Sequence, residues 1–244
     1  MRYDIVRQKR RYEMFDKNSK EEVLNLIKFF GRYEIRDDGI INKQYIYYDT
    51  DNLDLFKSGI ALFRTVVNGK HTLTMTLERL YNEDNKRLQS YLNKKNEIEI
   101  NPRDSIFDYT EFLRNSFKNM FDSSLAIDPD YLLKKLSLTY TINTTSHELR
   151  LINGTGFKAT LSFDNDQYIN HRAKRKSSGL YLTVYLHSRE DTDEEYDNLT
   201  SKLERYCASL TRIKESKVEI ARIKTRPIEK PQIDKKSKKD KKKK

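Results

Sequence analysis

Short segments in which apolar and polar residues alternate recur along this chain, and they constrain its fold more than any other feature. Alternation with a period of two is typical of β-strands that bury one face. The clearest example is segment 180–187, LYLTVYLH. Asn68-Gly69 and Asn153-Gly154 separate other segments of this kind, and this dipeptide is typical of tight hairpin turns. The pattern therefore predicts an antiparallel sheet.

The remaining segments predict both strands and helices. A helix over 19–30 is favoured by the capping-box spacing of Ser19 and Glu22 and by Gly31 after its last turn. Further helices are predicted at 104–121, 129–136 and 191–210. The predicted strands are 3–14, 43–49, 59–67, 71–79, 94–100, 137–144, 147–153, 157–164, 180–187 and 217–223. This order of elements indicates the α+β class, with an antiparallel sheet or barrel.

The positive charge of the chain is concentrated at one end. The 244 residues carry a formal net charge of +11, of which +7 belongs to residues 226–244 and only +4 to residues 1–225. The sequence therefore predicts one folded domain over 1–225 and a disordered, Lys-rich tail over 226–244. The tail could bind nucleic acid or polyphosphate or direct nuclear import, or it could simply aid solubility.

Composition excludes several classes of protein. Cys207 is the only cysteine, which rules out a disulfide framework and a cysteine-based zinc site. No apolar run approaches the roughly 20 residues that span a bilayer, and the N-terminus lacks the apolar core of a signal peptide. We therefore expect an intracellular protein without a membrane span, cytoplasmic or, through the basic tail, nuclear.

Three segments together resemble the CYTH/VTC superfamily of triphosphate tunnel metalloenzymes. Segment 47–62, YYDTDNLDLFKSGIAL, is similar to the family pattern Y-[FY]-D-T-x-x-x-x-L-x-x-x-G-x-A-L. Segment 7–12, RQKRRY, stands where the family opens with a strand such as E-x-E-x-K-[FY]. Segment 95–99, KNEIE, is similar to the R-x-E-x-E strand of the family. The order of elements fits this resemblance from about residue 3 to residue 223.

The resemblance implies an eight-stranded antiparallel β-tunnel with flanking helices. In this family, lumenal Lys and Arg bind a triphosphate and Glu residues hold Mg²⁺ or Mn²⁺. Members hydrolyse inorganic, thiamine or RNA 5′-triphosphates, cyclise ATP or polymerise polyphosphate. The tunnel geometry suits such chemistry because alternate residues of each strand face the lumen, where cations and a metal can stabilise phosphate charge.

This sequence departs from the family pattern at the positions that carry the chemistry. Arg7 and Lys9 occupy the places of the opening acids, and only Arg11 keeps the cationic character of the family residue. Ser146 stands where an Arg is expected. The lumenal side of segment 181–187 would present no carboxylate. Replacing acids by cations turns attraction for a dication into repulsion of about 4 kcal/mol per charge at about 4 Å.

The candidate site residues are those that retain or replace the charges of the family. The resemblance implies phosphate contacts for Arg7, Lys9, Arg11, Arg64, Lys95 and Lys217. It implies that Glu97 and Glu99 hold any residual Mg or Mn, with Asp164 or Asp166 as further acids. Two other interpretations stay open: a solvated face formed by the first-strand cations, and ion pairs of Glu97 and Glu99 with Lys94, Lys95 or those cations.

Three functional hypotheses follow. The leading one is a divergent tunnel domain, a pseudoenzyme, that binds a triphosphate, nucleotide or polyphosphate with hydrolase activity reduced or lost. The second is an active metal-dependent triphosphatase whose site is rearranged around Glu97 and Glu99. The third is a nucleic-acid-binding or assembly protein that keeps only the fold and uses the tail and the basic segment 171–176. Whether the chain is an enzyme is left open by the sequence.

Overall fold

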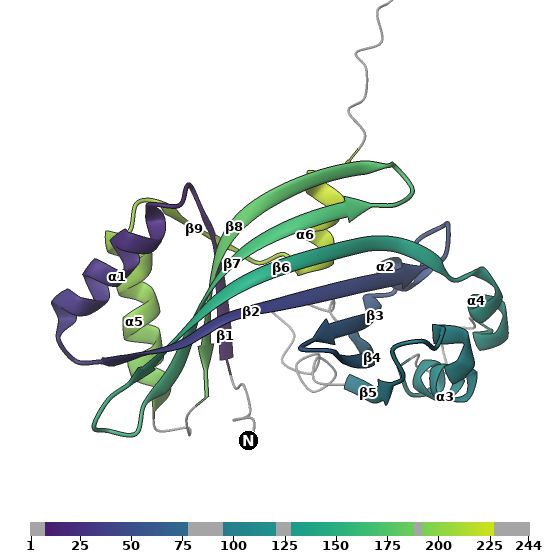
Figure 1. The fold of residues 1–244 in the computed structure, drawn as a ribbon, viewed down its shortest axis with the longest axis horizontal. Coiled ribbons are helices and arrows are strands. Elements are labelled where there is room, and N and C mark those ends of the chain that lie inside the picture. The colour runs from purple at the N-terminus through teal and green to yellow at the C-terminus, as the bar shows by residue number, and fades with distance from the viewer. Residues whose placement is uncertain (1–7, 78–94, 121–127, 188–191, 227–244) are drawn as a thin grey trace, which may run out of the picture.

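The protein folds around a single antiparallel sheet of nine strands, in the order β5-β4-β3-β2-β6-β7-β8-β1-β9 (Figure 1). The structure is a computed structural model, and it describes residues 8–77, 95–120, 128–187 and 192–226. Several parts of the sequence predictions lie outside these ranges: Arg7 with the start of the first strand, Lys94, residues 227–244 of the predicted tail, and the element ends at 78–79, 121 and 191.

The strands are β1 Gln8–Met14, β2 Glu34–Asp49, β3 Ile60–Val67, β4 Lys70–Leu77, β5 Lys95–Ile100, β6 Ser137–Ile152, β7 Lys158–Asn170, β8 Arg175–Leu186 and β9 Leu210–Ile213. The helices are α1 Ser19–Phe30, α2 Asp54–Lys57, α3 Thr110–Met120, α4 Pro129–Lys135, α5 Asp193–Tyr206 and α6 Lys217–Lys224, and a 3₁₀ turn, η1, spans Ile106–Tyr109. None of the described helices is long and apolar enough to cross a membrane.

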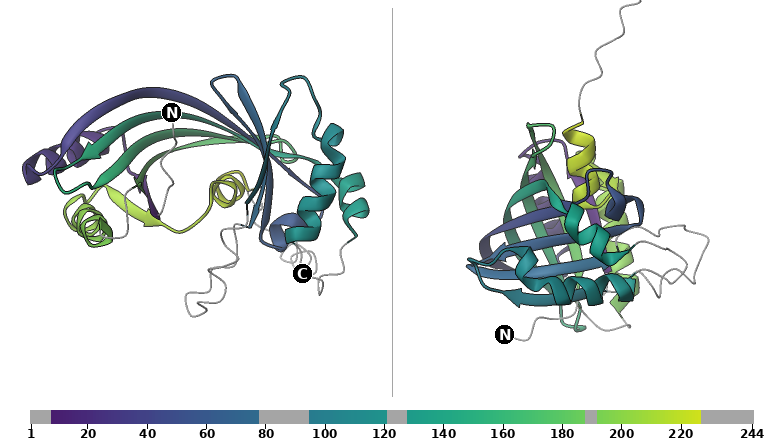
Figure 2. Two further views of the ribbon diagram at one scale, coloured as in Figure 1. Left: turned by 90° about the horizontal axis from the view of Figure 1, so that it is seen from below. Right: turned by 90° about the vertical axis from the view of Figure 1, so that its right-hand side faces the viewer.

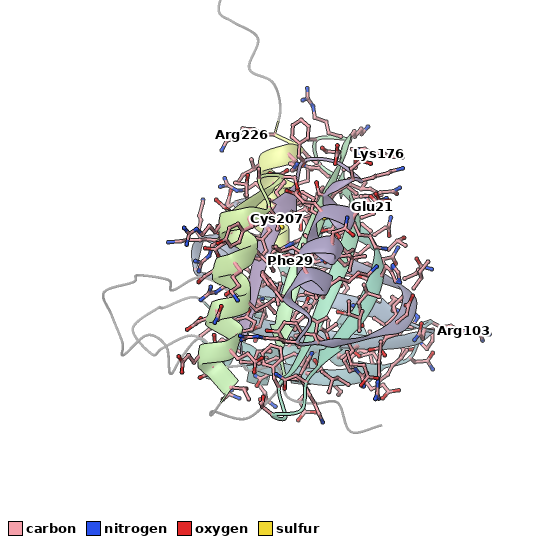
Figure 3. The ribbon with its side chains drawn as sticks, turned by 90° about the vertical axis from the view of Figure 1, so that its left-hand side faces the viewer. Glu21, Phe29, Arg103, Lys176, Cys207 and Arg226 are labelled. Carbon is pink, nitrogen blue, oxygen red and sulfur yellow. The ribbon has the colours of Figure 1, made fainter. Side chains whose placement is uncertain are left out.

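The sheet is an arch whose two faces carry different helices. Helices α1 and α5 pack on the outer face over β1, β6, β7 and β8, and α3 and α4 pack on the same face over β3 and β4. Helix α6 lies beneath the arch, against the inner face (Figure 2). Cys207, at the end of α5, is buried in the outer-face core as expected for an apolar residue (Figure 3). Burial raises the pKa of its thiol to about 11.

The α+β class and the antiparallel sheet are confirmed, but the sheet differs from the expected tunnel in two respects. It has nine strands rather than eight, and within the described residues its edge strands β5 and β9 are not hydrogen-bonded to each other. The extra strand is β9, four residues that pair with β1. Helix α6 then follows and buries Ile220 and Ala221 against four inner-face tyrosines, so a helix rather than further strand pairing covers the middle of the arch.

Local signals in the sequence identify several boundaries correctly. Helix α1 ends at Gly31 in the left-handed conformation, with φ 60°. Asn68 and Gly69 both have positive φ, as a two-residue hairpin turn requires. Two strand predictions are wrong in extent, because 137–144 and 147–153 form one continuous strand, β6. The residues between them pair with β2 and β7 throughout.

One sequence prediction has the wrong type of element. Residues 217–223, expected as a strand, belong to helix α6. The Ser216 hydroxyl accepts a hydrogen bond from the Glu219 backbone N–H, and the Glu219 carboxylate accepts one from the Ser216 N–H at 3.0 Å. This capping box satisfies two of the N–H groups that a helix start leaves open, and the helix carries Lys217 to the inner face.

The segment 47–62 is shaped by one buried carboxylate. Asp49 accepts hydrogen bonds from the backbone N–H groups of Thr50, Leu55 and Phe56, at 2.7, 2.9 and 3.0 Å. Its carboxylate thereby fixes the turn that leads from β2 into α2. The Arg172 side chain donates to the Asp49 carbonyl oxygen at 3.2 Å, so the same turn is tied to the β7–β8 hairpin.

Replacing Ser216 with Ala should destabilise the protein by about 1 kcal/mol, because it removes the hydroxyl that caps α6. Chemical denaturation would measure the change in free energy of unfolding. Ser201→Ala, an exposed position within α5, is the matched control and should be neutral or slightly stabilising. Equal effects of the two substitutions would contradict the capping role.

Candidate functional site

Strand registers bring a set of polar side chains together on the inner face, under α6. Arg11 of β1 pairs with Thr183 of β8, which pairs with Ser162 of β7. Two residues after Ser162 on β7, Asp164 lies opposite Ser146 of β6. Since alternate residues of a strand share a face, Asp166, two residues on, faces the same way.

The centre of this face is a cluster of four charged side chains: Arg11, Asp164, Asp166 and Lys217, hereafter the central cluster. The Arg11 guanidinium lies 2.6 Å from one oxygen of Asp166, and the Lys217 amino group lies 3.1 Å from the other. Lys217 also lies 3.7 Å from Asp164. The Asp166 side chain is 0% exposed, while those of Arg11 and Lys217 are 11% and 17% exposed. Two cations and two carboxylates thus nearly balance in a buried site.

Hydroxyl groups complete the coordination of both carboxylates. Thr144 and Tyr168 donate to Asp166 at 2.6 and 3.0 Å. Ser146 and Ser162 each donate to Asp164 at 2.7 Å. Buried carboxylates require such partners because an unpaired buried charge is costly.

Burial and charge act on the cluster in opposite directions. Burial alone would raise the pKa of Asp166, but Lys217, Arg11 and the hydrogen bonds outweigh it and hold that pKa below its ordinary value. Burial lowers the pKa of Lys217 in spite of the two nearby carboxylates. The pKa of Arg11 is raised because the attraction of Asp166 and its neighbours overcomes the cost of burial.

Aromatic rings surround the two cations. The Arg11 guanidinium lies 4.2 Å from the ring centroid of Tyr181, and the Lys217 amino group lies 5.0 Å from that of Tyr45. Ring faces stabilise a cation in a site with little water. Burial raises the pKa of Tyr45 and of Tyr185, so these phenols stay neutral and add no negative charge to the inner face.

The structure separates the predicted phosphate-binding residues into three groups. Arg11 and Lys217 meet in the central cluster, and Lys9 lies exposed on the inner side of β1, two residues before Arg11. Lys95 lies on the edge strand β5. Arg64 faces the outer side of β3, where its guanidinium donates to the carbonyl oxygens of Pro102 and Asp104 at 2.7 and 3.0 Å.

The predicted metal ligands, Glu97 and Glu99, lie on β5 at one edge of the sheet. Glu97 forms an ion pair with Lys95 and accepts a hydrogen bond from Thr74. Glu99 is 67% exposed and lies 2.8 Å from Lys70. The alternative interpretation of these acids as members of ion pairs agrees with the contact of Glu97, whose partner Lys95 it named. The partner of Glu99, Lys70 of β4, was not among the partners that it named.

The described residues do not form a complete metal site by themselves. Among residues 8–77, 95–120, 128–187 and 192–226, no three His, Cys, Asp or Glu side chains gather as a metal site would need. The two carboxylates at the centre already face Arg11 and Lys217, which would repel a dication.

Asp164 and Asp166 were candidates from the sequence, but their pairing with Lys217 and Arg11 was not predicted. Lys43 and Glu148, which form an ion pair at 2.5 Å between β2 and β6, were not candidates. Their even spacing from Tyr45 and Ser146 places them on the inner face, and that periodicity was the available signal.

The chain was compared with known protein families, sequences and structures. No family model and no curated protein sequence matches the chain. One similar solved structure is that of HpAC1 from Hippeastrum, which was assigned as an adenylyl cyclase and has a dominant triphosphatase activity. The two chains are 11% identical, and the match covers 88% of this chain and 94% of HpAC1 with a TM-score of 0.52. A protein from Bacillus halodurans assigned as an adenylate cyclase shares 13% identity, with 88% and 96% coverage and a TM-score of 0.46.

The comparison establishes the fold class. The chain has a CYTH-like fold, as the resemblance of segment 47–62 implies. At 11% identity the likeness to HpAC1 extends to the fold alone.

Replacing Asp166 with Asn should destabilise the protein by about 3–5 kcal/mol at neutral pH, because it leaves two buried cations without their shared anion. The folded-state pKa of Asp166 lies below the ordinary value of 3.8. The stabilisation is therefore complete above about pH 4 and is lost as the pH falls through the lowered pKa. Denaturant unfolding at several pH values should show the gap between the variant and the wild type closing in acid.

Asp197→Asn is the matched control for this prediction. Asp197 pairs with Arg10 on the outer face and its side chain is 56% exposed, so the loss should be about 1 kcal/mol or less. A variant at position 166 no less stable than this control would contradict the importance of the central cluster.

Proposed function

We propose that this chain is a divergent tunnel domain that binds a phosphate-rich ligand, such as a triphosphate, nucleotide or polyphosphate, with hydrolase activity reduced or lost. The observation that carries the proposal is the convergence of Arg11 and Lys217, from β1 and α6, on one inner-face position. Lys9 extends the positive charge along β1.

The chemistry of these cations favours phosphate. Only one terminal nitrogen of Arg11 binds Asp166, and its Nε is buried without a hydrogen-bond partner among the described residues. A guanidinium matches two phosphate oxygens in a planar fork, and a Lys amino group adds a mobile point charge. A phosphate oxygen would satisfy the Nε donor that the protein leaves open.

The same face supports binding better than hydrolysis. Tyr181, Thr183 and Tyr185 occupy the inner side of β8, where the family pattern places acids. The Asp164 and Asp166 carboxylates are held by Lys217, Arg11 and hydroxyl groups, so neither is positioned as a base for an attacking water. The triphosphatase activity of HpAC1 agrees with a phosphate-rich ligand for this fold.

Isothermal titration calorimetry with tripolyphosphate tests the binding. Arg11→Met and Lys217→Met should each weaken binding by about 10- to 100-fold, because each removes a charge-assisted contact worth about 1.5–3 kcal/mol. Arg10→Met removes a cation from the adjacent residue, which faces α5 on the outer side, and should change affinity less than about threefold. No binding by the wild type at millimolar ligand would overturn the proposal.

Hydrolysis is tested by phosphate release from tripolyphosphate with Mg²⁺ or Mn²⁺. We expect release at the level of the protein-free control, since the described carboxylates do not form a metal site. Release that depends on the metal and stops on Glu97→Ala or Glu99→Ala would instead establish the active triphosphatase and refute the loss of catalysis.

A further inference from the structure

The cations of the proposed phosphate site already hold an anion that belongs to the protein. Asp166 bridges Arg11 and Lys217, one to each carboxylate oxygen, at 2.6 and 3.1 Å. The carboxylate is fully buried and accepts four hydrogen bonds in all. It occupies the position between the two cations that a phosphate group would need.

The carboxylate does not depend on these cations for all of its partners. Thr144 and Tyr168 donate to opposite oxygens of Asp166, at 2.6 and 3.0 Å. These two hydroxyl groups would continue to hold Asp166 if Arg11 and Lys217 turned toward a ligand. Both cations retain some exposure, 11% and 17%, and the Nε of Arg11 has no hydrogen-bond partner in the part of the chain that the structure describes. The arrangement therefore allows exchange of partners without unfolding of the cluster.

We propose that Asp166 is a built-in competitor of the ligand, and that it makes the inner face selective for condensed phosphates over orthophosphate. The inference rests on the proposed function, because it concerns the same site. An orthophosphate ion can do no more than take over the contacts that Asp166 makes with Arg11 and Lys217. It must do so while the negative charge of Asp166 remains nearby and repels it. A condensed phosphate can replace them and also reach Lys9, which lies about 7 Å from Arg11 by strand geometry.

Removal of the competing charge tests the selectivity. Asp166→Asn should raise the affinity for tripolyphosphate by about tenfold or more in calorimetry. It should raise the affinity for orthophosphate by a larger factor, so that the ratio of the two affinities becomes smaller than in the wild type. Glu13→Gln is the matched control. Glu13 lies on the inner side of β1 and pairs with Lys224 at 2.6 Å, so its loss removes the same charge without freeing Arg11 or Lys217, and affinity should change less than about threefold.

A measurement on the wild type keeps the inference testable if the variant fails to fold. With ¹³C-labelled aspartate, the carboxyl resonance of Asp166 should shift on saturation with tripolyphosphate, because its cationic partners move to the ligand. The resonance of Asp197, whose partner Arg10 lies on the outer face, should stay in place.

The outcomes separate this inference from the function on which it rests. Wild-type binding with an unmoved Asp166 resonance, or a folded Asp166→Asn variant that binds no more tightly, overturns the competitor role and leaves the proposed function intact. Binding by the variant but not by the wild type supports the competitor role and refutes ligand binding by the natural chain. Absence of binding by both overturns both.

Discussion

The Asp166 carboxylate holds together the parts of the structure that define the inner face. It accepts hydrogen bonds from Arg11 of β1, Thr144 of β6, Tyr168 of β7 and Lys217 of α6. These groups come from separate parts of the sequence, and all four donate to one fully buried side chain. The position of α6 beneath the arch follows from this anchor together with the tyrosines on which Ile220 and Ala221 pack.

The pairing of charges on the inner face bears on whether the site suits binding or hydrolysis. A site for hydrolysis would need carboxylates that are available to a metal ion or to water, whereas the acids at the centre of this sheet are committed to cations and hydroxyls. Arg11 and Lys217 are therefore already paired with carboxylates of the protein. An anion that binds as proposed would compete with the protein's own carboxylates, and its affinity would depend on the number of contacts that it makes.

Periodicity predicted most of the sheet from sequence, because hairpins with Asn-Gly turns are local. Helix α6 was missed because Val218, Ile220 and similar residues of 217–223 suit a strand as well as a helix, although Ser216 and Glu219 carried a capping-box signal. The alternation of β1 placed Lys9 and Arg11 on the inner face correctly. The pairing of Lys217 with Asp166 could not be predicted, since it depends on how α6 docks after the chain has formed β8, α5 and β9.

The turn at Asp49 has a consequence for how such proteins are recognised. Its carboxylate accepts hydrogen bonds from three backbone N–H groups at the start of α2, so the most recognisable residue of this stretch shapes a bend in the main chain. A likeness confined to this stretch therefore indicates the scaffold, whether or not the chemistry survives. Only the lumenal side chains could distinguish a working enzyme from an inactive relative.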